Sequence, residues 1–208
     1  MTDKPDINDE PGRHLQIPKR NLLLLSVGSA VVYLLLAWLI FYFFHKTELV
    51  SAFEHGFSLS NQLWTGAVAG GAGAAVVTLL IKRPPVAGVL DDFYIVRALK
   101  NTPLTKFDCV QLSLFAGTGE ELLFRGAIQP LLGIWVTSVI FVGIHGYFKF
   151  QKPGHWVFGA MMFGLSMGLG YLFEYAGLAA AMTAHAVYDL IMLYLVADGS
   201  MSRSGQTP

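Results

Sequence analysis

The chain has 208 residues, of which 54% are hydrophobic and 13% are charged, and its mean hydropathy is +0.53. These values lie outside the range of ordinary soluble domains and indicate an integral membrane protein. The formal net charge is zero, and the lack of a Lys/Arg-rich tract argues against nucleic-acid binding through phosphate neutralisation. The single cysteine, Cys109, cannot form an intramolecular disulfide.

The N-terminal part of the chain predicts a tail followed by a membrane helix. Residues 1–20 are polar, contain Pro and Gly and show no periodic apolar face, so we expect a disordered cytoplasmic tail. The run 22–44 contains no charge and is long enough to cross a bilayer. It is too long for the core of a signal peptide, and we expect an uncleaved first helix.

A polar loop at 45–62 separates this helix from a second apolar run at 63–81. Gly66 and Gly70 in the second run have the spacing that lets two helices approach closely, so we interpret it as a packing helix. Beyond it, the apolar residues of 89–100 recur at helical spacing, which predicts a short helix lying in the membrane interface.

The second half of the chain predicts four closely connected spans. Thr105 and Asp108 fit a capping box at the start of the first of them. In the next-to-last span, Gly164 and Gly168 lie four residues apart, and we interpret them as a packing surface rather than a ligand site. The expected ranges of the four spans are 105–130, 131–148, 156–173 and 178–196.

The expected fold is therefore all-α: a polytopic bundle of about six transmembrane helices with one short interfacial helix. We expect a single membrane domain over residues 21–198 and a C-terminal tail over 199–208. Lys and Arg concentrate in the N-terminal tail, in the connection 82–106 and at Lys149 and Lys152. Since basic residues favour the cytoplasmic side, this distribution predicts that both termini are cytoplasmic.

Two adjacent carboxylates and an arginine, Glu120, Glu121 and Arg125, lie in the middle of a long apolar run. Each charge near the centre of a bilayer costs about 3 kcal/mol, so these groups must face protein, water or one another. On a helix, Glu121 and Arg125 share a face, while Glu120 is turned away by about 100°. Arg125 can thus hold Glu121 and leave Glu120 as a general base; the alternative is a structural charge network that fixes helix register.

Three further polar residues lie in the later spans. His145 lies near the expected cytoplasmic end of the span 131–148, and His185 and Asp189 share a face of the span 178–196. His145 alone is equally typical of an interfacial residue, and the other two could form a structural hydrogen-bonded pair. Taken with the carboxylates, such a cluster can activate water by acid/base action or around a metal. No H-E-x-x-H motif is present, so the sequence does not support that type of metalloprotease.

The spacing of these residues also resembles a known family. Glu120-Glu121-x-x-x-Arg125, Phe141-x-x-x-His145 and His185-x-x-x-Asp189 are similar to the three motifs of the CPBP family of membrane proteases. This family includes CAAX prenyl endopeptidases and bacteriocin-processing or immunity proteins. The match covers about residues 105–196 in the family's motif order.

The resemblance implies a helical intramembrane endopeptidase. Glu120 would be the catalytic carboxylate that activates water with His145, Arg125 would hold Glu121, and His185 would help to stabilise the oxyanion. The third motif of the family often ends in Asn, whereas this chain has Asp189. An amide can donate a hydrogen bond to an oxyanion, while an ionised Asp repels it, so Asp189 is either protonated, or orients His185, or alters activity.

We expect no cofactor, although the ligand set leaves a divalent ion such as zinc open as an alternative. The expected partners are membrane lipids and a peptide or protein substrate, lipidated or not, with no nucleic acid. The expected location is the bacterial plasma membrane. Two other function classes stay open: a non-catalytic peptide-binding or immunity-type protein, and a proton-coupled transporter that uses the buried groups as a relay.

Overall fold

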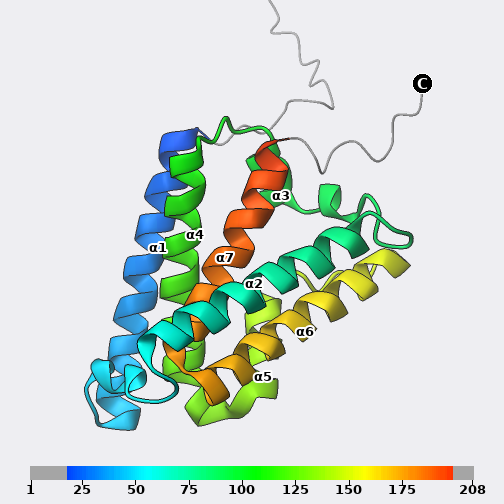
Figure 1. Cartoon of the computed structure of the whole chain (residues 1–208). Helices are drawn as coiled ribbons and strands as arrows, with labels where there is room; N and C mark the ends of the chain where they lie inside the picture. Colours follow the sequence, from blue (N-terminus) through cyan, green and yellow to red (C-terminus); the bar gives the residue numbers. More distant parts are fainter. Residues whose placement is uncertain (1–17, 199–208) are drawn as a thin grey trace, which may run out of the picture.

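The computed structural model describes residues 18–198, and this part of the chain is helical without any strand (Figure 1). The expected all-α fold is confirmed. The expected tails at 1–20 and 199–208 lie outside the described residues, except that Lys19 and Arg20 already belong to the first helix. The elements are α1 (Lys19–Ile40), η1 (Phe41–His45), η2 (Leu49–Phe53), α2 (Leu59–Ile81), η3 (Val89–Asp92), α3 (Tyr94–Lys100), α4 (Lys106–Glu121), η4 (Leu122–Ile128), α5 (Gln129–Ile144), α6 (Pro153–Ala176) and α7 (Leu178–Ala197).

Five helical segments in the described part are long and apolar enough to cross a membrane, so the chain is an integral multi-pass membrane protein. The third segment, Lys106–Ile144, has 39 residues and combines two spans that the sequence predicted separately. The chain turns at Gly133, whose φ of 77° lies outside the helical region. The part beyond the turn, 134–144, rises only about 16 Å, which is about half the thickness of the hydrocarbon core. The expected fourth span is thus a helix too short to cross the hydrocarbon core by itself.

The segment expected as one interfacial helix at 89–100 consists of two pieces. The 3₁₀ turn η3 and the helix α3 are separated by Phe93, whose backbone is extended with a ψ of 125°. Val89 and Phe93 are both 4% exposed and belong to the hydrophobic core. The apolar face of this segment therefore packs on the protein.

Helix α7 lies at the centre of the bundle, between α2 and α4 (Figure 1). A Cβ atom at Gly66 or Gly70 would overlap the backbone oxygens of Ala180 and Ala184 on α7, so the expected close packing of this glycine pair is confirmed. Since α7 has little freedom to shift against α2, the polar side chains that it carries have a firmly held backbone.

The expected capping box opens α4. Thr105 accepts a hydrogen bond from the backbone N–H of Asp108, and the Asp108 carboxylate accepts one from the backbone N–H of Thr105 at 2.7 Å. Lys19 lies 2.6 Å from the same carboxylate, so the first turns of α1 and α4 are joined. The last turn of α7 lies at this end of the bundle as well (Figure 1).

Candidate active site

The two adjacent carboxylates occupy the last positions of α4, directly before the π-helical segment η4. Glu120 is 9% exposed and Glu121 is fully buried. Short π-helical segments inside longer helices frequently occur at functional sites. Here η4 contains Arg125, the residue that faces Glu121.

Glu121 is held by two cationic or hydrogen-bonding partners. Its Oε2 accepts a hydrogen bond from Arg125 Nε at 3.0 Å, and its Oε1 lies 2.8 Å from His185 Nδ1. Arg125 Nη2 in turn donates to Ser166 Oγ at 3.0 Å, and the Phe141 ring lies 5.2 Å from its Cζ. These contacts join α4, η4, α6 and α7 around one buried carboxylate, and they occupy both of its oxygens.

Glu120 is arranged differently, because its Oε2 faces two imidazoles. His145 Nε2 lies 3.3 Å away and His185 Nε2 lies 4.0 Å away. Among the described residues 18–198, no group makes a regular hydrogen bond with this oxygen. Glu120 is thus the carboxylate that stays available to a further molecule, as the sequence predicted from its turn away from Glu121.

His145 is oriented by its own helix. Its Nδ1 lies 2.7 Å from the backbone oxygen of Phe141, so Nδ1 carries a proton and Nε2 is directed at Glu120. Burial lowers the pKa of His145, but the neighbouring Glu120 carboxylate raises it, and the net direction is upward. This arrangement favours the imidazolium form of His145.

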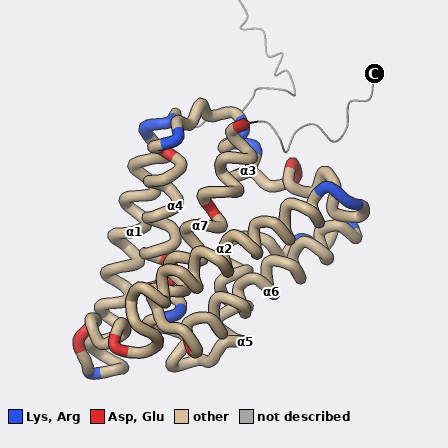
Figure 2. The backbone as a smooth tube through the Cα atoms, in the orientation of Figure 1, with Lys and Arg blue, Asp and Glu red and all other residues tan. Residues whose placement is uncertain are grey.

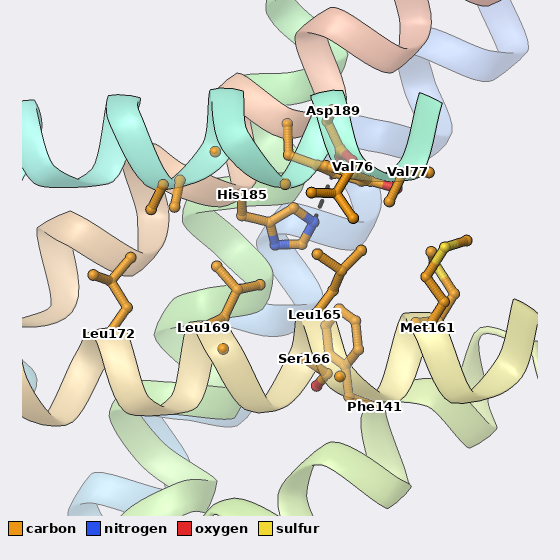
Figure 3. Close-up of a pocket in the computed structure, with 18 of the residues that line it drawn as sticks. Val76, Val77, Phe141, Met161, Leu165, Ser166, Leu169, Leu172, His185 and Asp189 are labelled. Atoms are coloured by element: carbon orange, nitrogen blue, oxygen red, sulfur yellow. Dashed lines mark ion pairs between the residues drawn. The ribbon is translucent and has the colours of Figure 1, made fainter. Parts of the chain in front are cut away.

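Asp189 completes the group from the next turn of α7. Its Oδ2 lies 3.5 Å from His185 Nε2, and its side chain is 28% exposed (Figure 3). All six polar residues that the sequence singled out are therefore connected through contacts of 4.0 Å or less.

A cavity of about 740 Å³ lies over this group, between α2 and α6 (Figure 3). Figure 3 shows His185 and Asp189 of α7 at the back of the space between these two helices. Most of the lining is apolar. The lining from α2 and α6 includes Val76, Val77, Met161, Leu165, Leu169 and Leu172.

Gly164 and Gly168 also line this cavity. No described atom lies within 4 Å of a Cβ built at either glycine. The expectation that they form a packing surface is wrong: these two glycines widen the cavity instead.

The comparisons with known proteins agree with this geometry. A family described as Type II CAAX prenyl endopeptidase Rce1-like matches residues 102–191. This stretch is an Rce1-like domain. The match begins just before α4 and ends just after Asp189, so the Rce1-like domain contains all six polar residues.

This chain is also similar to the uncharacterized protein YpbD of Bacillus subtilis (strain 168). It is 36% identical over 81 residues, which are 38% of this chain and 41% of YpbD. The aligned part thus spans less than half of that relative. No solved structure gives a significant match.

The sequence did not reveal two further residues at the centre of the Rce1-like domain. Ser166 is 1% exposed and accepts the hydrogen bond of Arg125, but a lone serine in a Gly- and Met-rich span carries no signal of this role. Tyr147 lines the cavity and stacks on His145, with ring centroids 5.6 Å apart. Its position two residues after His145 was the only available signal.

Metal ligation was left open by the sequence. Within residues 18–198, no group of three or more His, Cys, Asp and Glu side chains has the spacing to hold a metal ion. The nitrogens of His145 and His185 instead lie at ion-pair distance from Glu120. That the Rce1-like domain needs no cofactor stays a prediction, for which chelation of the purified protein is the direct test.

Proposed function

We propose that this chain is an intramembrane endopeptidase of the CAAX-protease type, which hydrolyses a peptide bond near the membrane surface. The observation that carries the proposal is the pair formed by Glu120 and His145, 3.3 Å apart, in the wall of a large apolar cavity. Water bound beside such a pair can be deprotonated by the carboxylate. The family of the matched domain supports the choice of a peptide bond as the substrate.

In the proposed reaction, Glu120 takes a proton from water while the hydroxide attacks the carbonyl carbon of the scissile bond. The His145 imidazolium then gives its proton to the leaving amine as the C–N bond breaks. Transfer of the proton from Glu120 to His145 restores the starting state, so one water is consumed for each bond cleaved. The upward pKa shift of His145 supports its role as the acid.

The other four residues hold the surroundings of this pair in place. Arg125 and Glu121 hold the backbone of η4 and the ring of His185, because both are fully buried and hydrogen-bonded to each other. His185 presents its Nε2 to both Glu120 and Asp189. Asp189 acts as the residue that orients His185, since a carboxylate would repel an oxyanion.

We also propose that the end of the bundle that carries the first turn of α1 faces the cytoplasm. Lys and Arg gather at the start of α1 and at the connections near α3 (Figure 2). Lys46 follows η1, at the other end of the helical segment that begins at Lys19. Basic residues favour the cytoplasmic side of a membrane. A cysteine placed at Ser51 should then react with an impermeant reagent only from outside the cell.

The test of the activity compares new peptide termini in membranes that contain the wild-type chain or Glu120→Gln. This substitution keeps the size of the side chain and removes the base, so the termini produced by the wild type should be absent. Glu48→Gln, a change of an exposed acid in the first loop, is the matched control and should behave like the wild type. Equal sets of termini from wild type and Glu120→Gln would refute the proposal, and the termini found would identify the substrate.

A second candidate is a non-catalytic protein that binds a peptide in the cavity. The observation that favours it is Asp189, which places a carboxylate where relatives of the family often have an amide. Under this alternative, Glu120→Gln and wild type would both bind the peptide and neither would produce new termini.

A further inference from the structure

The cavity wall contains two carboxylates, those of Glu120 and Asp189, and most of its neutral hydrogen-bond donors are tyrosine hydroxyls. Ser166 Oγ accepts a hydrogen bond from Arg125 and is only 1% exposed, and His185 Nδ1 is bonded to Glu121. His185 Nε2 faces the carboxylates of Asp189 and Glu120, which are acceptors. Peptide hydrolysis places a negative charge on the carbonyl oxygen, and that charge needs a donor aimed at it.

Tyr147 is a phenol whose ring contacts one member of the proposed acid/base pair. Its ring is stacked on the His145 ring, at an interplanar angle of 15°, and it lines the cavity. Phe93 and Phe158 hold the same ring edge-on from two other elements, with centroids 5.7 and 5.6 Å away. The ring thus has little freedom, because aromatic pairs in these geometries attract one another beyond the effect of burial.

Polar contacts hold the segment that follows Tyr147 in place, in addition to the ring contacts of Tyr147. Lys149 Nζ donates to the backbone oxygen of Asp92 at 2.7 Å, and the Asp92 carboxylate lies 2.9 Å from both Lys152 Nζ and His155 Nε2. His155 is only 1% exposed. These contacts join η3 to the start of α6 and fix the chain on the C-terminal side of Tyr147, so that residue keeps a constant place beside His145.

We propose that the hydroxyl of Tyr147 donates a hydrogen bond to the carbonyl oxygen of the scissile peptide as that oxygen gains negative charge. The proposal rests on the endopeptidase function above and adds a catalytic residue to it. When hydroxide adds to the carbonyl carbon, the electron pair of the C=O bond moves to oxygen and is stabilised by the phenol. When the C–N bond breaks, the pair returns, and Tyr147 keeps its proton throughout.

The phenol is suited to this role because it stays neutral. Burial raises the pKa of Tyr147 above its ordinary value, and the carboxylates of Asp189 and Glu120 raise it further. A phenol with a raised pKa remains a donor across the whole neutral range.

Tyr188 is a second phenol in the cavity wall, and it provides a comparison. Its electrostatic neighbours include Tyr147 and Asp189, and it is held on α7 one turn away from Ala184. No ring contact joins it to His145 within the described residues. Removal of the Tyr188 hydroxyl should therefore slow the reaction less than removal of the Tyr147 hydroxyl.

The experiment uses the purified full chain in phosphatidylglycerol/phosphatidylethanolamine vesicles. The probe is a membrane-protein extract of the expression host, and the readout is the rate at which Glu120-dependent termini form. Tyr147→Phe keeps the ring and removes the hydroxyl, and loss of one such donor should slow the rate about 100-fold. Tyr94→Phe, a change of an exposed tyrosine outside the cavity, is the matched control and should stay within about twofold of the wild type.

A second measurement separates the hydroxyl from the ring. The imidazole carbon signals of His145 should titrate alike in wild type and Tyr147→Phe, but should shift in Tyr147→Leu, which removes the stacked ring. A Tyr147→Phe protein that cleaves at the wild-type rate overturns the donor role, and so does a slow one whose His145 signal has shifted. If the wild type itself forms no Glu120-dependent termini, the endopeptidase function fails, and the role of Tyr147 fails with it.

Discussion

Two pairs of glycines in this chain have the same spacing and opposite surroundings. Gly66 and Gly70 on α2 lie against the backbone of α7, where a Cβ atom has no room. Gly164 and Gly168 on α6 line the cavity, and no described atom lies within 4 Å of a Cβ at either position. The same sequence pattern thus closes one side of α7 and opens the other.

The difference shows how the bundle combines rigidity with access. The α2–α7 contact keeps α7 in place, and α7 carries His185 and Asp189. The α6 glycines line the same cavity as these two residues, and a substrate could lie in it. A site that activates water in a membrane needs both properties, because its groups must hold their geometry while a chain enters.

The largest effect is expected from Gly70→Leu. The new side chain would collide with the backbone of Ala184, and overpacking of this kind costs up to about 3 kcal/mol. The midpoint of unfolding in mixed detergent micelles should fall accordingly. Gly71→Leu is the matched control on the next residue, where no described atom lies within 4 Å, and its stability should change by less than about 0.5 kcal/mol. Equal losses from both changes would mean that α2 is simply intolerant of leucine.

Gly168→Leu should lower the stability less than Gly70→Leu does, and its main effect should be on the rate of the reaction. The leucine would occupy the cavity in front of His185 and displace a bound peptide, and misplacement by about 1 Å can cost about 100-fold in rate. The measurement is the rate of formation of Glu120-dependent termini, with unfolding followed in the same vesicles. Ala160→Leu on the exposed face of α6 is the control. A wild-type rate for a stable Gly168→Leu protein would show that the reaction does not use this cavity.

The sequence predicted those features that depend on local chemistry. The capping box of Thr105 and Asp108, the pairing of Glu121 with Arg125 and the packing at Gly70 all follow from spacing along one helix, and the structure has all three. In each case the residues that interact lie within one turn, or the steric demand comes from a missing side chain.

The features that the sequence did not predict depend on what lies opposite a helix. Spacing places Gly164 and Gly168 on one face, but it does not say whether that face meets a helix or a cavity. The turn at Gly133 lies within an apolar run, so hydropathy offered no sign that α5 stops halfway. Ser166 became part of the site only because α6 passes beside Arg125. Such contacts are set by tertiary packing rather than by local pattern.

The smallest effect is expected from two alanine substitutions that should change the free energy of unfolding in opposite directions. This pair is also the sharpest test of the comparison. Gly164→Ala adds a methyl group in open space and improves helix propensity, so it should raise the free energy of unfolding by up to about 1 kcal/mol. Gly66→Ala makes the same gain in propensity, but its Cβ meets Ala180 and Thr183 on α7, so the net effect should be a loss of about 1 kcal/mol, because a single added methyl group lies at the lower end of the cost of overpacking. Both are measured by unfolding of the full chain in the same detergent. Because propensity contributes equally at the two positions, an equal result would leave no role for the α7 backbone, and the closed and open sides of α7 would be energetically alike.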